Sequence, residues 1–276
     1  MRLWWSVFVA PMLWYSQASA EELSFRMPPQ AEVVDARRIA DYRQAVDAIV
    51  QVMVTKFDLP VPRGSLQVYT SREEFEEGLI RYLKVERAVA HSASEFSKAA
   101  VGSYTLLVNA PQVAGLTWPE RIELMAHELT HNVQLTLANR PGIARPQWLI
   151  EGFAEWMAFN VTDALGLDDV AAARERMIRT LRGLRAKQGL PRLIAVDTFA
   201  DWVETRRKYG FDATYPLAFV MTDFLVQRHS LAAVKRFFEA FRRSQDPLAN
   251  FRNAFGEEPE AFDRALQAHL DKLLGG

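Results

Sequence analysis

Residues 127–131 read HELTH, a spacing that suits a divalent metal ion. His127 and His131 are four positions apart, so on an α-helix both imidazoles leave the same face one turn apart. Zinc favours imidazole nitrogens as ligands, and the carboxylate of Glu128 could act as a base beside the ion. The same letters also arise by chance in an ordinary helix turn. The neighbouring sequence must therefore decide between a metal site and an exposed polar surface.

A catalytic zinc ion requires a third protein ligand and an open position, because two histidines do not complete its coordination. Glu151 stands 20 positions after His131, in the stretch PQWLIEGFAEWMAF, and Glu155 follows one helical turn later. On this second helix the apolar residues fall on the side away from the two carboxylates. They are Leu149, Phe153, Trp156 and Met157.

The helix that carries HELTH has a well-marked start. Thr117 and Glu120 can form a capping box, and Pro119 suits the first turn, so we predict a helix over 118–138. Its main apolar stripe lies opposite the histidines, with Leu124 and Leu135 outside it; the stripe consists of Ile122, Met125, Leu129 and Val133. Two successive helices thus place metal-binding residues opposite their apolar faces. Joined by a short connection, they could converge on one cleft.

The rest of the chain predicts an α+β fold that is mostly helical. We expect a long helix over 31–57 and another over 71–83. Strands are predicted at 65–71 and at 101–111, where Tyr104, Leu106 and Val108 share one face. Further helices are expected at 147–160, 168–187, 197–208, 214–229, 231–243 and 259–273. A small sheet with the HELTH helix would form an N-terminal lobe of about 21–138, followed by an all-helical lobe of about 139–276.

The first twenty residues, MRLWWSVFVAPMLWYSQASA, have the layout of a signal peptide. One basic residue precedes a short apolar run, and Ala18 and Ala20 suit a cleavage site. We therefore expect an exported protein, periplasmic or secreted, with a mature chain of 21–276. The alternative is a retained membrane anchor, although the apolar run is shorter than the roughly 20 residues of a spanning helix.

Composition excludes several classes of protein. The chain has no cysteine, so no disulfide can stabilise it. It carries 33 basic and 34 acidic residues, and removal of the first twenty takes away only Arg2. A nearly balanced charge gives no indication of a nucleic-acid partner.

HELTH followed by WLIEGFAEW resembles the gluzincin zinc metallopeptidases, most closely the peptidase MA-like group. In that group H-E-x-x-H is followed about 20 residues later by an E-G-x-A-E segment. Weaker similarity runs through LQVYTSREEF, SYTLLVN, ATYPLAFVMTDFLVQRHS and NAFGEEPEAFDRAL, and so covers most of residues 65–270. The two-part motif is specific, whereas the flanking similarities are not. The resemblance implies a zincin-like fold and a peptide or protein substrate.

The resemblance also implies individual roles. His127, His131 and Glu151 would bind one zinc ion per chain, and Glu128 would be the general base for an attacking water. Glu155 would fix the tautomer of a liganding histidine, and Tyr215 would stabilise the developing oxyanion. The chain lacks a G-x-M-E-N-like segment, so aminopeptidase activity is not expected. The sequence gives neither the substrate nor the choice between endo- and exopeptidase action.

Several alternatives remain open from the residues alone. Glu155 could be a solvated helix charge, and Tyr215 could be a packing residue, with Tyr209 and His229 as rivals for its role. The basic stretch 206–208 could bind a substrate carboxylate or be a solvated charge run. Trp148, Phe153 and Trp156 are expected to pack in the core. The whole chain could also be a catalytically silent zincin-fold binding protein with a structural zinc.

Overall fold

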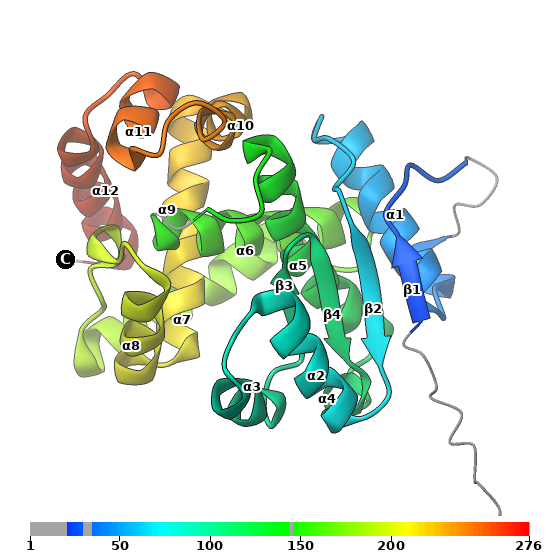
Figure 1. Cartoon of the computed structure of the whole chain (residues 1–276). Helices are drawn as coiled ribbons and strands as arrows, with labels where there is room; N and C mark the ends of the chain where they lie inside the picture. Colours follow the sequence, from blue (N-terminus) through cyan, green and yellow to red (C-terminus); the bar gives the residue numbers. More distant parts are fainter. Residues whose placement is uncertain (1–20, 30–34, 144–145, 276) are drawn as a thin grey trace, which may run out of the picture.

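The computed structural model describes residues 21–29, 35–143 and 146–275. The predicted signal peptide, residues 1–20, lies outside the described residues. A small mixed sheet with helices precedes a long, purely helical part, so the predicted α+β, mostly helical class is confirmed (Figure 1). Among the described helices, none is both long and apolar enough to cross a membrane.

The N-terminal part contains the sheet and the helix that carries HELTH. Its strands are β1 (Glu21–Ser24), β2 (Ser65–Tyr69), β3 (Ala99–Gly102) and β4 (Thr105–Asn109). Its helices are α1 (Tyr42–Thr55), α2 (Arg72–Leu83), α3 (Arg87–Ser94), α4 (Ala110–Val113) and α5 (Trp118–Ala138), with a 3-10 turn at Ala36–Arg38. The C-terminal part comprises α6 (Gln147–Ala164), α7 (Val170–Gln188), α8 (Phe199–Tyr209), α9 (Phe211–His229), α10 (Leu231–Ala240), α11 (Pro247–Phe255) and α12 (Pro259–Leu274), with a 3-10 turn at Leu193–Ala195.

The sheet has the strand order β1-β2-β4-β3. β2 and β4 run parallel, whereas β1 and β3 pair antiparallel with their neighbours. Side chains alternate across β4, so Leu106 and Val108 enter the main core and Leu107 packs on the other side with α2. α2 and α3 thus cover one face of the sheet, and α1 and α5 lie on the other face (Figure 1).

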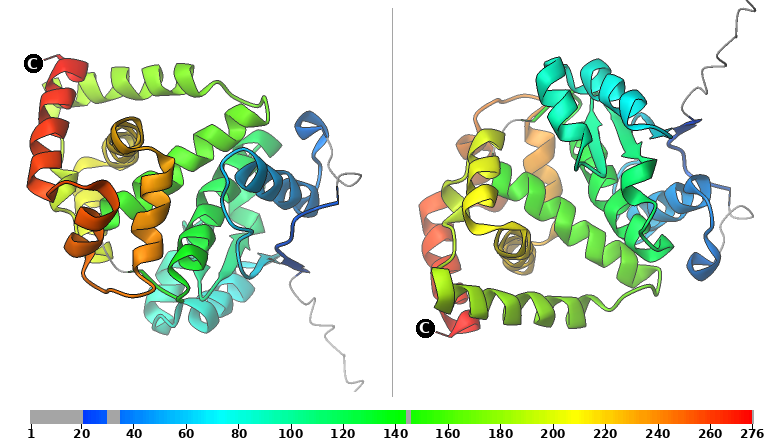
Figure 2. Two further views of the ribbon diagram at one scale, coloured as in Figure 1. Left: turned by 90° about the horizontal axis from the view of Figure 1, so that it is seen from above. Right: turned by 90° about the horizontal axis from the view of Figure 1, so that it is seen from below.

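The sheet and the C-terminal helices lie on opposite sides of the helix pair α5 and α6. Both views of Figure 2 show the N-terminal elements on one side and α7 to α12 on the other. Leu129 of α5, Phe153 of α6 and Phe219 of α9 are fully buried in one continuous hydrophobic core. The two helices that carry the predicted metal ligands are therefore held between the two halves of the molecule.

The predicted bounds of the HELTH helix are correct. α5 begins after Thr117, whose backbone N–H donates to the Glu120 carboxylate at 2.7 Å, as expected of a capping box. Its predicted apolar stripe is buried throughout: Ile122, Met125, Leu129 and Val133. Trp148, Phe153 and Trp156 of α6 are also buried, so their predicted packing role is confirmed.

Two predicted elements were wrong in their extent. Of the helix predicted over 31–57, residues 31–34 lie outside the described residues, and from residue 35 onward only α1 is an α-helix, because Ile39 is extended and the side chain of Asp41 caps a new helix start. The strand predicted over 101–111 is a hairpin of β3 and β4, with Ser103 and Tyr104 at positive φ in the turn, and a helix begins at Ala110. Besides the two 3-10 turns, four of the described elements were not predicted, namely β1, α3, α4 and α11.

Gly152 lets α6 and α9 approach closely just beside Glu151. A Cβ atom at this position would lie 2.4 Å from Thr222 Oγ1 and 2.6 Å from the backbone oxygen of Ala218. A side-chain hydroxyl can rotate, but a helix carbonyl cannot retreat without moving α9. The glycine therefore sets the distance between the helix of Glu151 and the helix of Tyr215.

We expect Gly152→Ala to lower the free energy of unfolding by about 1–3 kcal/mol, the usual cost of overpacking a close contact. Chemical denaturation followed by circular dichroism measures the change. Gly183→Ala is the matched control, because nothing lies within 4 Å of a Cβ added at that exposed position of α7. The control should be neutral or more stable, since alanine favours a helix interior by about 0.5–1 kcal/mol. Equal stability of Gly152→Ala and the parent would contradict the close approach.

Candidate metal centre

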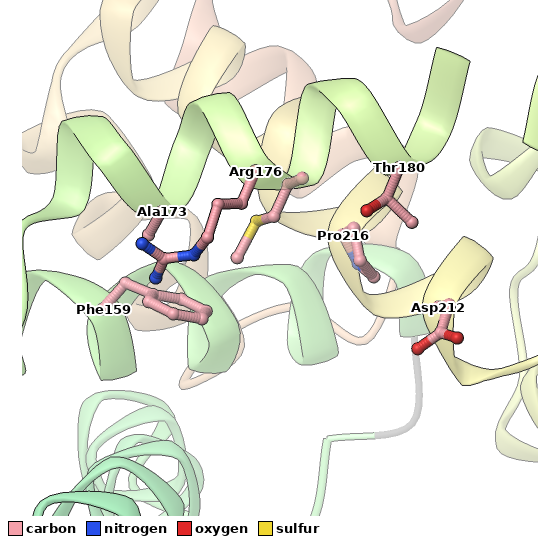
Figure 3. A pocket seen from close by; sticks show the side chains of 7 residues that line it. Phe159, Ala173, Arg176, Thr180, Asp212 and Pro216 are labelled. Atoms are coloured by element: carbon pink, nitrogen blue, oxygen red, sulfur yellow. The ribbon is translucent and has the colours of Figure 1, made fainter. Parts of the chain in front are cut away.

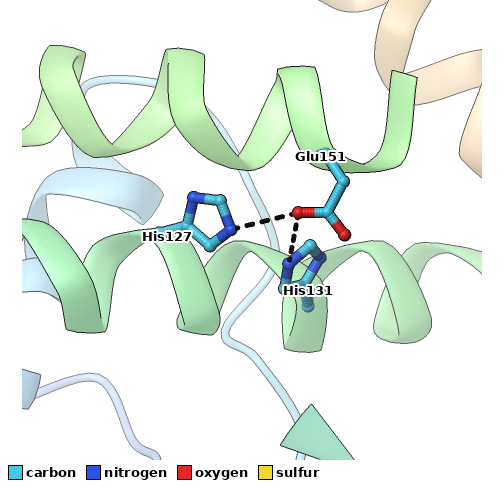
Figure 4. Close-up of side chains that lie close together, drawn as sticks. All are labelled: His127, His131 and Glu151. Atoms are coloured by element: carbon cyan, nitrogen blue, oxygen red, sulfur yellow. Dashed lines mark ion pairs between the residues drawn. The ribbon is translucent and has the colours of Figure 1, made fainter. Parts of the chain in front are cut away.

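His127, His131 and Glu151 form a group that could hold a metal ion (Figure 4). Nε2 of His127 lies 3.5 Å from Oε2 of Glu151, and Nε2 of His131 lies 4.0 Å from the same oxygen. One ligand atom from each residue lies within 4.8 Å of the others. The two imidazoles come from successive turns of α5, and the carboxylate comes from the neighbouring helix α6.

The donor set and its spacing fit zinc. Ligand atoms about 2.1 Å from a tetrahedral ion are about 3.4 Å apart, close to the separations observed here. Two neutral imidazoles and one carboxylate are the ligand types of catalytic zinc sites, which retain an open fourth position. Glu151 is buried, and both histidines are mostly shielded from solvent. The three side chains are thus already gathered where an ion would bind.

Polar side chains hold each of the three donors in place. Nδ1 of His127 contacts Oε2 of Glu155 at 3.1 Å, and Nδ1 of His131 contacts Oε1 of Gln134 at 3.1 Å. Nε2 of Gln147 donates to Oε1 of Glu151 at 2.8 Å. A carboxylate or amide oxygen only accepts, so each histidine donates through Nδ1 and keeps Nε2 available for a metal.

The charges around the ligands favour a cation at their centre. Burial alone would lower the pKa of His127, but its contacts with Glu151 and Glu155 raise that pKa well above the usual value. Burial alone would raise the pKa of Glu151, yet its contact with His127 and the nearby His131 lower that pKa. Both shifts describe a positive charge stabilised between imidazole and carboxylate, which is the place that a metal ion would take.

Glu128 lines a cleft of about 370 Å³ next to His127, Glu155 and Tyr215. Burial raises the pKa of Glu128 above its ordinary value, with the charge of Glu151 adding to the effect and the two histidines opposing it. Among the contacts of the described residues, Glu128 has neither a hydrogen bond nor an ion pair. It is therefore free to exchange a proton with a molecule in the cleft.

Tyr215 lies in the first turns of α9, where its ring centre is 6.0 Å from that of His127. Trp202 packs edge-on against it at 5.3 Å, and Phe211 stacks on it at 5.8 Å. Nη1 of Arg206 donates to the Tyr215 hydroxyl at 3.4 Å. Because arginine only donates, the phenol oxygen accepts and its own hydrogen stays available. Burial, followed by the negative charge of Glu151, raises the pKa of Tyr215 to about 12, so the hydroxyl keeps its proton.

The rivals of Tyr215 lie elsewhere. The backbone oxygen of Tyr209 accepts from Gln188 at the end of α8, and its side chain does not line the cleft. His229 pairs with Glu257 at 2.5 Å at the far end of α9. Of the basic stretch 206–208, Arg206 contacts Tyr215, whereas the other two side chains are exposed.

Gln134 and Gln147 were not predicted as part of the site. Gln134 follows His131 by three positions and Gln147 precedes Glu151 by four, so each shares a helix face with the ligand that it contacts. This spacing was the available signal. It is weak, because an uncharged amide on an exposed helix face has the same pattern.

Protein-family models, curated proteins and solved structures provide no match to this chain. A function for this chain is therefore inferred from the sequence motif and from the geometry of the site.

Proposed function

We propose that this protein is a zinc-dependent metallopeptidase of the gluzincin type, with a zincin-like fold. The observation that carries the proposal is the convergence of His127, His131 and Glu151 beside an unpaired carboxylate, Glu128, that lines the same cleft. A catalytically silent binding protein would need the three metal ligands but would not need the carboxylate of Glu128. Export follows only from the sequence of residues 1–20 and remains part of the proposal.

The chain would hold one zinc ion through Nε2 of both histidines and a carboxylate oxygen of Glu151. Zinc at such a site lowers the pKa of water towards about 7 and polarises a carbonyl. Glu128 would take the proton of the attacking water on its carboxylate and then deliver it to the leaving amine. Gln134, Gln147 and Glu155 would keep the ligands oriented throughout.

An extended peptide would align along the edge strand β3. β4 offers no free edge to a peptide, because it is hydrogen-bonded to β2 on one side and to β3 on the other. In the described sheet β3 has only one partner, and Lys98, just before it, lines the cleft together with Glu128. Backbone pairing with β3 would therefore lead a substrate into the cleft.

The test of this function is a cleavage assay on the zinc-loaded chain 21–276. A mixed peptide library is incubated with the protein, and new termini are identified by mass spectrometry. We expect cleavage that a chelator abolishes and added zinc restores. A zinc-containing parent that cleaves nothing in the library would contradict the proposal and favour the binding protein.

We expect Tyr215→Phe to lower kcat about 10–10³-fold with little change in KM, while zinc content and folding persist. The hydroxyl would donate to the carbonyl oxygen only as negative charge develops there, so its loss affects the transition state and not substrate binding. Steady-state kinetics on a cleaved library peptide gives both constants. Tyr209→Phe is the matched control and should behave as the parent. The reverse pattern would transfer the role to Tyr209.

A further inference from the structure

Glu123 is a second unpaired carboxylate in the same cleft. It precedes His127 by one turn of α5, so both side chains leave the same face of the helix. Glu123 is half-buried and lines the cleft with His127 and Glu128. Within the described part of the chain it makes no hydrogen bond and no ion pair. Apart from Glu128, the other acidic groups that line the cleft are engaged, Glu155 with His127 and Glu120 with Thr117.

The surroundings of Glu123 compensate its negative charge only in part, because Lys98 lines the same cleft but no ion pair joins the two among the described residues. Burial raises the pKa of Glu123 to about 7, and the negative charges of Glu155 and Asp168 add to the shift. Arg176 is the basic group nearby on α7, but its guanidinium pairs with Asp168 at 2.9 Å. Figure 3 shows the Arg176 side chain beside Phe159, lining a separate hollow of about 180 Å³ with Asp212 and Pro216. A cation brought by a ligand would therefore favour the ionised form of Glu123 and pair with it.

The walls of the cleft are suited to a long side chain. Leu116, Leu124 and Ala158 contribute apolar surface to the lining that also holds Glu123. Lysine and arginine combine an aliphatic stem with a charged head, and such side chains lay the stem along apolar surface. A free amino terminus has the charge but lacks the stem.

We infer that Glu123 is a specificity-determining residue that binds the positively charged side chain of a lysine or arginine in the substrate peptide. This inference rests on the proposed function, because it assigns a preference to the same cleft. The carboxylate would select basic side chains by direct pairing and would reject acidic ones by repulsion.

The test compares blocked peptides that differ at one position. The peptides have acetylated and amidated ends, and a single lysine is placed in turn at each position of a cleaved sequence, with norleucine as the uncharged counterpart. In the parent, kcat/KM for lysine should exceed that for norleucine at least tenfold at one position. In Glu123→Gln this ratio should fall at least tenfold, to about one, because the carboxylate that pairs with lysine is lost. Glu123→Asp keeps the charge and should retain part of the preference.

Glu73→Gln is the matched control, because it removes the same charge from an exposed position of α2 outside the cleft. It should keep the lysine-to-norleucine ratio of the parent. Zinc content and thermal unfolding show whether each variant is folded. A parent without the lysine preference, or a preference that persists in folded Glu123→Gln, would overturn the inference. A preference seen only in peptides with a free amino terminus would overturn it as well, since the α-amine would then be the ligand.

A binding measurement separates this inference from the proposed function. Calorimetry with zinc-loaded Glu128→Gln and the lysine and norleucine peptides requires no hydrolysis. The inference is supported if Glu128→Gln binds the lysine peptide more tightly than the norleucine peptide and the double variant with Glu123→Gln added does not. This holds even if the parent cleaves nothing and the peptidase proposal fails. Equal binding of both peptides to Glu128→Gln overturns the inference, even if the parent is an active peptidase.

Discussion

Glu128→Gln should leave the zinc content of the protein unchanged and lower its hydrolytic rate about 10²–10⁴-fold, the usual contribution of a general base. Glutamine has the shape of glutamate but cannot accept the proton of the attacking water. Among the contacts of the described residues, Glu128 has no hydrogen bond or ion pair with Gln134, Gln147 or Glu155, the side chains that hold the ligands in place. The substitution therefore removes proton transfer and leaves the ligand set intact.

Elemental analysis of the purified variant and single-turnover cleavage of a library peptide measure the two effects side by side. The Glu73→Gln control changes the net charge by the same amount on exposed α2 and should cleave at the parent rate. If Glu128→Gln turned over as fast as the parent, a different group would be the base, and the proposed mechanism would be wrong. Loss of zinc together with activity would instead give Glu128 a role in metal binding.

The helix pair that carries the site could be predicted because local signals and periodicity agree there. A capping box marks the start of α5, and an apolar stripe lies opposite its histidines. On α6 the predicted apolar residues Leu149, Phe153, Trp156 and Met157 are buried, although Glu151 on the other side is buried as well. When the faces of two successive helices are both specified, the convergence of their polar sides follows from packing the apolar sides into one core.

The hairpin β3–β4 could not be predicted, because its turn uses residues that do not mark turns. Ser103 and Tyr104 both adopt positive φ, a conformation in which glycine, asparagine or aspartate is expected. Without such a residue the β-rich pattern continues through the turn and reads as one strand. This turn decides which strand lies at the edge of the sheet, and the path that we propose for a peptide depends on it.

The side chains that hold the ligands could not be predicted from the sequence, for a different reason. Gln134 and Gln147 act through contacts that depend on side-chain direction and on the distance between α5 and α6. Gly152 helps to set the neighbouring distance between α6 and α9, and its role appears only when Thr222 and Ala218 are seen against it. Spacing along one helix identifies residues that share a face. It does not identify which of them meet a residue from another helix.

Glu151→Ala should weaken zinc binding by roughly 3–4 kcal/mol, or a few hundredfold in Kd, if one of three ligands supplies about a third of a total on the order of 10 kcal/mol. His131→Ala should have an effect of the same size. Nε2 of His131 lies 4.0 Å from Oε2 of Glu151, so both side chains place a donor atom in the candidate site. Truncation of either leaves two protein ligands, and the remaining position must be filled by water.

Competition with a chromophoric chelator gives the affinities, and a graded series of variants tests the geometry. Glu155→Ala and Gln134→Ala remove groups that only orient the histidines at 3.1 Å, so they should cost about 10–100-fold, less than loss of a ligand. Parent-like affinity in Glu151→Ala would remove that carboxylate from the ligand set. If Glu155→Ala then showed the larger loss, the ion would lie on the Nδ1 side of His127, where Glu155 and not Glu151 faces the ring. The order of the two losses therefore decides which imidazole nitrogen binds the metal.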